Sequence, residues 1–123
     1  MNQPFKAKID TPCGDKPNCV ASVDQREDFH IAPWTLTPSA SFIQVVSAIQ
    51  SVPSSKLISK TDDYAHFTFT SRWLKFVDDV EIQQRGDQVF LRSESRIGHS
   101  DFGVNRKRML KLGQKLKQLS LII

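Results

Sequence analysis

Three carboxylates that could do chemistry lie close together at Asp78, Asp79 and Glu81. Such a cluster could supply metal ligands or an acid/base pair. Alternation along a strand puts Asp79 and Glu81 on one face and Asp78 on the other, unless a bulge turns both aspartates the same way. A carboxylate on an apolar face needs hydrogen bonds or a cation, which favours a structural ion pair of Asp78 over catalysis. The candidate partners of Asp78 are Ser93, Ser95, Arg96 and Arg106.

A polar turn from Ser95 to Arg106 is the strongest candidate for a binding site. It places Arg96, Ser100 and the first amides of a following helix close together, and this combination suits phosphate, sulfate or carboxylate. In the alternative, Asp101 caps the helix and occupies the position of an external anion, so that the arginines neutralise Asp101 or Asp78. The turn is therefore either a ligand site or a self-contained network.

Two cysteines, Cys13 and Cys19, stand near the start of the chain. They predict a disulfide in an oxidising compartment, and the alternative is a pair of free thiols in a cytosolic loop. A metal site that used them would need Asp15 and His30 without a recognisable ligand motif, so we expect no metal and no cofactor.

Nucleophilic catalysis has little support in the sequence. Ser93, Ser95 and Ser100 lie near His99, but no nucleophile elbow and no Cys–His signature occurs. The five glycines are scattered and form no phosphate-binding loop. The enzyme hypothesis that remains uses Asp78 or Asp79 with His99 or Arg96 in a cleft at the sheet end.

The basic charge of the chain belongs to one segment. Seventeen basic and thirteen acidic residues give a net charge of +4. Residues 104–119 contain no acid and six bases, namely Arg106, Lys107, Arg108, Lys111, Lys115 and Lys117. Without aromatic residues between them, this pattern favours a solvated helix flank and argues against nucleic acid. Weak contact with an anionic membrane surface, sensitive to charge reversal at Lys111 and Lys115, is the alternative.

Hydrophobic periodicity predicts the elements that position these residues. An apolar stripe with a period of 3.6 predicts a helix from Thr37-Pro38 to Pro53. The period then changes to two, which predicts strands over 56–60, 64–70, 73–83 and 88–95. A second helix is expected after Ser100 or Asp101, with a buried stripe at Met109, Leu112, Leu116, Leu119 and Ile123.

These elements predict an α+β fold, in which a four-stranded antiparallel meander carries two helices on one face. Residues 1–36 lack periodicity and are expected to form an irregular arm ahead of one domain over 37–123. In the last hairpin, matching apolar positions pairs Ile82 with Val89, Asp78 with Ser93 and Asp79 with Arg92. No apolar run is long enough to span a bilayer, and residues 1–10 carry no secretion signal.

Three segments together resemble the domain of unknown function 1499 family. They are Pro-Asn-Cys-Val near the start, Asp-Asp-Val-Glu at 78–81, and Arg-Ser-Glu-Ser-Arg-Ile-Gly-His-Ser-Asp-Phe-Gly-Val-Asn-Arg-Lys-Arg at 92–108. The resemblance implies no established activity. Similar members are often bacterial or plastid proteins with an export, lipid or membrane segment before the domain, so the compartment stays open.

The preferred hypothesis is a non-enzymatic module for a small anionic or amphipathic ligand, or for a protein partner. The residues expected to form its site or a structural polar network are Asp78, Asp79, Glu81, Arg92, Ser93, Ser95, Arg96, Ser100, Asp101, Asn105 and Arg106. A pocket of several hundred Å³ that converges on Asp78 and Arg96 would favour ligand or enzyme chemistry over an interaction surface.

Overall fold

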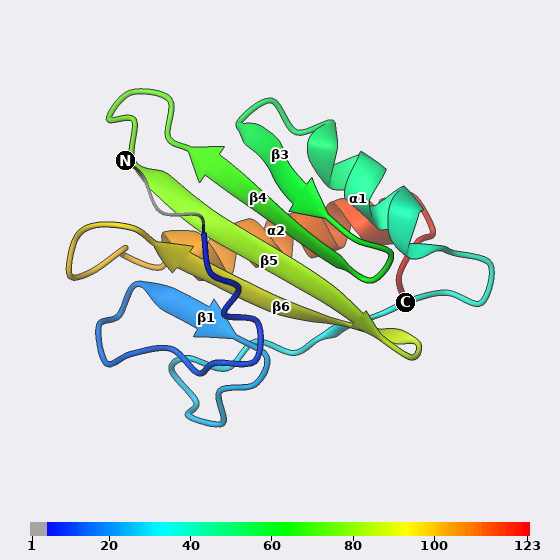
Figure 1. Ribbon diagram of the computed structural model, residues 1–123, viewed down its shortest axis with the longest axis horizontal. Helices are drawn as coiled ribbons and strands as arrows, with labels where there is room; N and C mark the ends of the chain where they lie inside the picture. The colour runs from blue at the N-terminus through cyan, green and yellow to red at the C-terminus, as the bar shows by residue number, and fades with distance from the viewer. Residues whose placement is uncertain (1–4) are drawn as a thin grey trace.

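The computed structural model describes residues 5–123 and shows an antiparallel sheet with both helices on one face (Figure 1). Its strands are β1 (Cys19–Ala21), β2 (Trp34–Thr35), β3 (Ser55–Lys60), β4 (Tyr64–Thr70), β5 (Val77–Arg85) and β6 (Gln88–Ser95). The helices are α1 (Phe42–Gln50) and α2 (Val104–Gln118). The strand order is β1-β6-β5-β4-β3, and β2 also pairs with β6.

The sheet has six strands, where the periodicity predicted four. The two additional strands come from the segment that was expected to be irregular, and they cover the outer edge of β6, which would otherwise expose unpaired backbone groups. Val20 of β1 and Trp34 of β2 are buried in the main hydrophobic core. This part of the arm therefore belongs to the core architecture, although its sequence carries no periodic signal.

Helix α1 begins four residues after the predicted start. Ser41 is its N-cap, and the side chain of Gln44 accepts a hydrogen bond from the Ser41 backbone (2.9 Å). The hydroxyl of Thr37 instead donates to the carbonyl of Ser120 (2.8 Å), so Thr37 ties the helix approach to the C-terminal segment. The predicted apolar stripe is buried at Phe42, Val45, Val46 and Ile49.

Helix α2 begins at Val104, and its N-cap is the left-handed Gly103 (φ 81°) and not the predicted Ser100 or Asp101. Met109, Leu112 and Leu116 of its stripe are buried. Leu119 and Ile123 are exposed, which corrects the prediction, because the helix ends at Gln118 and the chain turns away. Ile122 is buried in their place and bridges to Leu36.

The β5–β6 hairpin is offset by two residues from the predicted register. A two-residue loop, Gly86-Asp87, joins Arg85 to its partner Gln88, and the positive φ of Gly86 (65°) suits such a turn. A shift of two residues keeps every side chain on its face, so matching apolar positions could not detect it. The partner of Asp78 is Ser95 and that of Asp79 is Glu94. The predicted pairs with Ser93 and Arg92 are wrong, and so is the predicted pair of Ile82 with Val89, because Ile82 lies opposite Leu91.

Both faces of the sheet are covered. The apolar side chains of β4, β5 and β6 pack against the helices, with Phe67, Val80 and Leu91 almost fully buried. The opposite face is polar, and the N-terminal segment crosses it (Figure 1). His66 and Glu81 are consequently buried on that polar face. Within residues 5–123, no helix is both long and apolar enough to cross a bilayer.

Candidate functional site

Asp78 forms a buried ion pair with an arginine of α2. The Nη2 atom of Arg108 lies 2.7 Å from Oδ2 of Asp78, and both side chains are largely shielded from water. The guanidinium of Arg108 also lies over the ring of Phe69, 5.0 Å from its centroid. Asp78 therefore meets a cation on the apolar face, but its partner is Arg108 and neither Arg96 nor Arg106. The pair fastens the first part of α2 to the sheet.

Asn105 is the centre of a buried hydrogen-bond network beside this pair. Its Oδ1 atom accepts from the hydroxyl of Ser93 (2.6 Å) and from Nη1 of Arg108 (3.1 Å). Its Nδ2 atom donates to the Asn18 carbonyl (3.2 Å), to Ser95 Oγ (2.9 Å) and to Asp101 Oδ2 (2.8 Å). Asn105 thus joins β6, the segment before β1 and the start of α2.

The carboxylate of Asp101 accepts hydrogen bonds from backbone amides at the start of α2. Its carboxylate accepts from the backbone N–H of Gly103 (2.8 Å) and of Asn105 (3.1 Å). Arg106 donates to the backbone carbonyl of Asp28 (3.1 Å) and contacts no motif carboxylate. The turn therefore has the self-contained arrangement, in which an internal carboxylate takes the position of an external anion. A pocket of about 180 Å³ beside the turn is lined by Ser100, Asp101 and Arg106, among others.

A second network lies on the polar face of the sheet. Oδ1 of Asp79 lies 2.7 Å from Nε2 of His66, and Arg96 donates to both carboxylate oxygens (2.9 and 3.0 Å). The ring of Phe5 stacks on His66 with 3.8 Å between centroids. Burial alone would raise the pKa of Asp79, but the hydrogen bonds from His66 and Arg96 outweigh it and lower that pKa to about 2. His99, the histidine named in the enzyme hypothesis, is exposed.

Asp79→Asn is expected to make stability less dependent on pH in the acid range. The folded-state pKa of Asp79 is about 2, below the ordinary value of 3.8, so Asp79 adds stability above the unfolded pKa and loses it as pH falls from about 4 to about 2. One pKa unit corresponds to about 1.4 kcal/mol, and water screens this partly exposed carboxylate, so the contribution is at most about 2 kcal/mol. Urea unfolding at several pH values measures it. Equal acid destabilisation of wild type and variant would contradict the assignment, and exposed Asp62→Asn is the control.

Glu81 and Arg92 bind the N-terminal segment to the same polar face. Glu81 Oε1 accepts from the Tyr64 hydroxyl (2.7 Å) and from the backbone N–H of Lys8 (2.8 Å). Arg92 donates to the Thr11 carbonyl (3.0 Å) and to Glu94 (2.7 Å). Burial raises the pKa of Tyr64, and the Glu81 carboxylate adds to the effect. These contacts serve to hold the segment across the sheet.

The loop before β1 has its own covalent and ionic connections. Cys13 and Cys19 form a disulfide, with 5.8 Å between their Cα atoms. Arg26 donates to both carboxylate oxygens of Asp24 and to the carbonyl of Cys13 (2.9 Å). The hydrogen bond from Arg26 lowers the pKa of buried Asp24 to about 2, even though burial opposes the change. Residues 5–123 contain no group of three His, Cys, Asp or Glu side chains placed to hold a metal ion.

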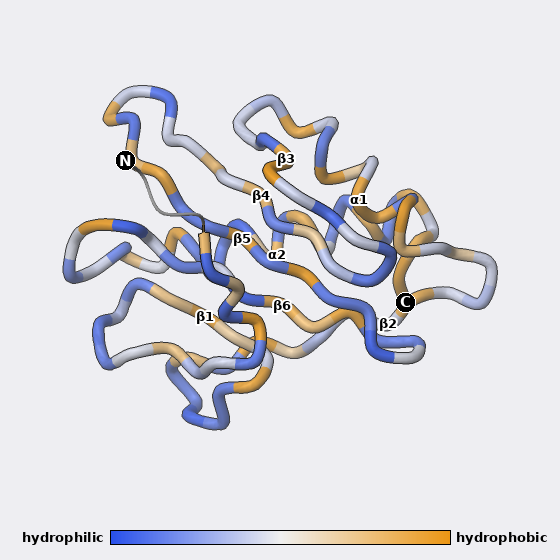
Figure 2. Tube along the Cα trace, in the orientation of Figure 1, coloured by the Kyte–Doolittle hydropathy of each residue, from blue (hydrophilic) through white to orange (hydrophobic). Residues whose placement is uncertain are grey.

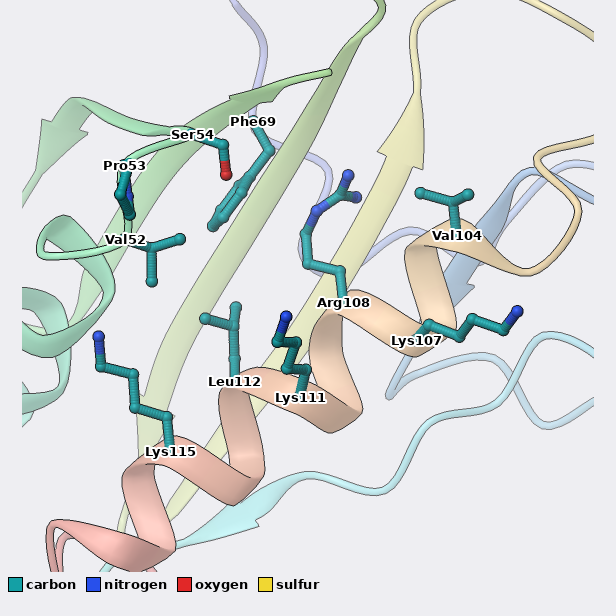
Figure 3. Close-up of a pocket in the computed structure, with 10 residues that line it drawn as sticks. All are labelled: Val52, Pro53, Ser54, Phe69, Val104, Lys107, Arg108, Lys111, Leu112 and Lys115. Carbon is teal, nitrogen blue, oxygen red and sulfur yellow. The ribbon is translucent and has the colours of Figure 1, made fainter. Parts of the chain in front are cut away.

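A groove of about 560 Å³ lies between α2, the end of β4 and the loop after α1 (Figure 3). Its apolar surface comes from Val52, Pro53, Phe69, Val104 and Leu112. The charged residues that line it are all cations, Lys107, Arg108, Lys111 and Lys115. Figure 3 shows the side chains of Lys111 and Lys115 rising from α2 on the side of Val52, whereas Lys107 extends away from Val52 and Leu112.

The cations of the groove differ in their existing partners. Arg108 is paired with Asp78, and Lys115 Nζ donates to the hydroxyl of Ser51 (2.6 Å). Among residues 5–123, the ammonium groups of Lys107 and Lys111 have neither an ion-pair partner nor a hydrogen-bond partner. Because Lys107 extends away from Val52 and Leu112 (Figure 3), Lys111 is the better placed of the two to meet an external anion at this apolar surface.

The structure divides the predicted site residues into two groups. Asp78, Ser93, Ser95, Asp101 and Asn105 meet at the start of α2, on the helix face of the sheet. Asp79, Glu81, Arg92 and Arg96 lie on the opposite face under the N-terminal segment. The backbone of Phe102 donates to Ser100, and Arg106 contacts Asp28. Because the two groups lie on opposite faces, they form no single site.

Sequence reasoning missed Asn18, Arg108, His66 and the groove. Asn18 and Arg108 both belong to motif segments, so the motif itself was a signal that they join the network. The groove carried only a weak signal, since its apolar residues come from three separate segments. The four-residue spacing of Lys107, Lys111 and Lys115 does indicate three cations along one side of the second helix.

The fold and these networks define a small α+β domain whose shared motif builds the junction between a helix and an antiparallel sheet. The chain belongs to the DUF1499 family, described as a protein of unknown function, whose model matches residues 11–116. That match includes both cysteines, the carboxylate strand and the whole turn before α2. No curated protein and no solved structure matches the chain.

Proposed function

We propose that this domain is a non-enzymatic binding module for a small amphipathic anion, and that the groove beside α2 is its site. The observation that carries the proposal is the union of an apolar surface with a lining whose only charges are positive. An acyl or similar apolar chain would lie against Val52, Phe69 and Leu112. Its acidic head group would meet Lys111.

The groove supports this proposal better than the turn before α2 does. The amides of the turn are already occupied by Asp101, and the neighbouring pocket of about 180 Å³ is about one third the size of the groove. The groove falls within the usual range of small-molecule sites, about 300 to 1,000 Å³. Reversible binding of such a ligand requires no general acid or base in the groove, in keeping with a non-enzymatic role.

Dodecanoate is a suitable first probe, studied by calorimetry below its micelle concentration. Wild-type protein is expected to bind it saturably, to bind the neutral decyl glucoside more weakly, and to leave acetate unbound. The apolar chain supplies most of the binding free energy, and Lys111 adds a charge-assisted hydrogen bond. Failure of dodecanoate to bind, or equal binding of acetate, would overturn the proposal.

Lys111→Glu is expected to weaken dodecanoate binding by about ten-fold or more, because a charge-assisted hydrogen bond contributes about 1.5 to 3 kcal/mol. Lys117→Glu is the matched control. It makes the same charge change on the same exposed helix, but Lys117 is outside the groove. Calorimetric affinities of the two variants decide the point: an equal loss in both would indicate a general charge effect and contradict a site at Lys111.

A further inference from the structure

Exposed apolar side chains gather at one end of the sheet, outside most of the groove. The β4–β5 loop (71–76) and the β6–α2 loop (96–103) both leave this end, because Thr70 pairs with Val77 and Asp78 with Ser95 (Figure 1). Figure 2 shows orange, hydrophobic stretches in both loops. Six of the eleven exposed large apolar side chains in residues 5–123 lie here: Trp73, Leu74, Phe76, Ile97, Phe102 and Val104.

Two aromatic residues stand out in this group. Trp73 is 83% exposed and Phe102 is 88% exposed, so neither of these large apolar side chains is buried in the core of the domain. Water contact with so much apolar surface is unfavourable, and a clustered apolar patch is typical of an interaction site. The occupant of this end must therefore accept aromatic and aliphatic side chains.

The backbone and the family motif hold Phe102 in this outward position. Its φ of 53° lies in the left-handed region, which is uncommon for a residue that is not glycine. Ser100 Oγ accepts the Phe102 N–H (3.2 Å), and Asp101 Oδ1 accepts the Gly103 N–H (2.8 Å). The polar residues of the motif thus build a turn that presents Phe102. Lys75, in the other loop, also has a positive φ (58°).

The charge of the two loops selects the occupant. Arg72 and Lys75 lie in the first loop, with the Arg72 guanidinium over the Trp73 ring (5.1 Å to its centroid). Arg96, which begins the second loop, is already paired with Asp79, so the unpaired basic charge comes from the first loop. The only acid in either loop is Asp101, whose carboxylate is held by helix amides. Aromatic and aliphatic tips among basic side chains match the interface of an anionic bilayer.

We propose that this end of the sheet docks on an anionic lipid surface, with Trp73 and Phe102 inserted at the level of the head groups. This surface adjoins the groove at Val104 but is otherwise separate from it and from the flank of α2 that carries Lys111 and Lys115. Docking here places the loops, and not the helix flank, against the lipid. The proposal does not depend on ligand binding in the groove.

Tryptophan fluorescence with lipid vesicles tests the proposal directly. The chain has two tryptophans, and Trp34 is buried, so a spectral change on vesicle binding reports Trp73. With phosphatidylglycerol in phosphatidylcholine vesicles, the emission is expected to shift to the blue and to be quenched by brominated lipid. Added salt should weaken the binding. Absence of a shift and of quenching, or equal binding to pure phosphatidylcholine, would overturn the proposal.

Paired variants locate the contact by vesicle co-sedimentation. Trp73→Ser with Phe102→Ser is expected to reduce partitioning at least about ten-fold, because two large apolar side chains leave the interface. The matched control, Ile43→Ser with Leu110→Ser, removes two exposed apolar residues from the helices and should leave partitioning unchanged. Equal losses in the two double variants would overturn the assigned surface.

Lys111→Glu distinguishes lipid docking by the two loops from ligand binding in the groove and from lipid contact through the flank of α2. It should abolish most dodecanoate binding while leaving vesicle partitioning within a few-fold of wild type, since Lys111 is not in either loop. If Lys111→Glu eliminates vesicle binding while Trp73→Ser with Phe102→Ser retains it, the lipid contact lies on the helix flank and the docking proposal is wrong.

Discussion

Asn105→Ala is expected to reduce the free energy of unfolding by about 3 kcal/mol. The substitution removes five hydrogen bonds of a fully buried side chain at once. It leaves the hydroxyl of Ser93, itself fully buried, without the acceptor that it now uses. An unsatisfied buried polar group costs about 1 to 3 kcal/mol, and in this network more than one group would lose its partner. Urea unfolding followed by circular dichroism measures the difference.

Gln114→Ala is the control for this experiment, because Gln114 is an exposed amide on the same helix. It is expected to change stability by less than about 0.5 kcal/mol. A loss below about 1 kcal/mol in Asn105→Ala would show that the network is not structural. A stable Asn105 variant would then return attention to the turn as a ligand site.

Asp78→Ala is expected to destabilise the protein by about 3 kcal/mol or more. It leaves the guanidinium of Arg108 between the helix and the sheet without its carboxylate, and an unpaired charge in such a place is strongly unfavourable. The remaining contacts of Arg108 with Asn105 and Phe69 are retained only in part, because they were arranged around the ion pair. The midpoint of urea unfolding should fall accordingly.

The double variant Asp78→Leu with Arg108→Met distinguishes the attraction between the two charges from the cost of burying them. Removing both charges and filling the space with apolar side chains is expected to recover most of the lost stability, because the cost of dehydrating two ions also disappears. A double-mutant cycle should give a coupling free energy above about 1 kcal/mol. If the double variant loses as much stability as the two single variants together, the pair is not a coupled unit.

The partner of Asp78 illustrates how far sequence reasoning reaches at this site. An acid at an apolar position indicated that a cation or hydrogen bonds must be near, and the structure supplies a cation. The sequence offered several arginines at plausible distances, and the choice of Arg108 depends on where α2 begins. Helix α2 starts at Val104, so Arg108 lies one turn into the helix and faces the sheet.

The β5–β6 hairpin shows a second limit to what the sequence predicts. The bounds of β4 and β6 were predicted to the residue, since each follows a clear alternation between turn residues. Alternation determines which side chains share a face, but it repeats every two residues and leaves the register open by that amount. The two-residue turn at Gly86 decided the register, and with it which charges lie opposite Asp79 and Glu81.

By itself, the sequence determined the class of fold, the apolar faces of both helices and the family to which the chain belongs. It also singled out Ser93, Ser95, Asp101 and Asn105, which meet at the start of α2, but not Asn18 or Arg108, which join them there. Those properties follow from local periodicity and from a motif that reads along the chain. Tertiary structure alone decided that the N-terminal segment adds two strands and buries the polar face of the sheet.

The tertiary structure also decided that the motif divides between two faces and that a groove opens beside α2. The physical reason is that these features depend on contacts between segments far apart in the chain, such as Asn18 with Asn105. Loop lengths and helix starts set such contacts, and no periodic pattern records them.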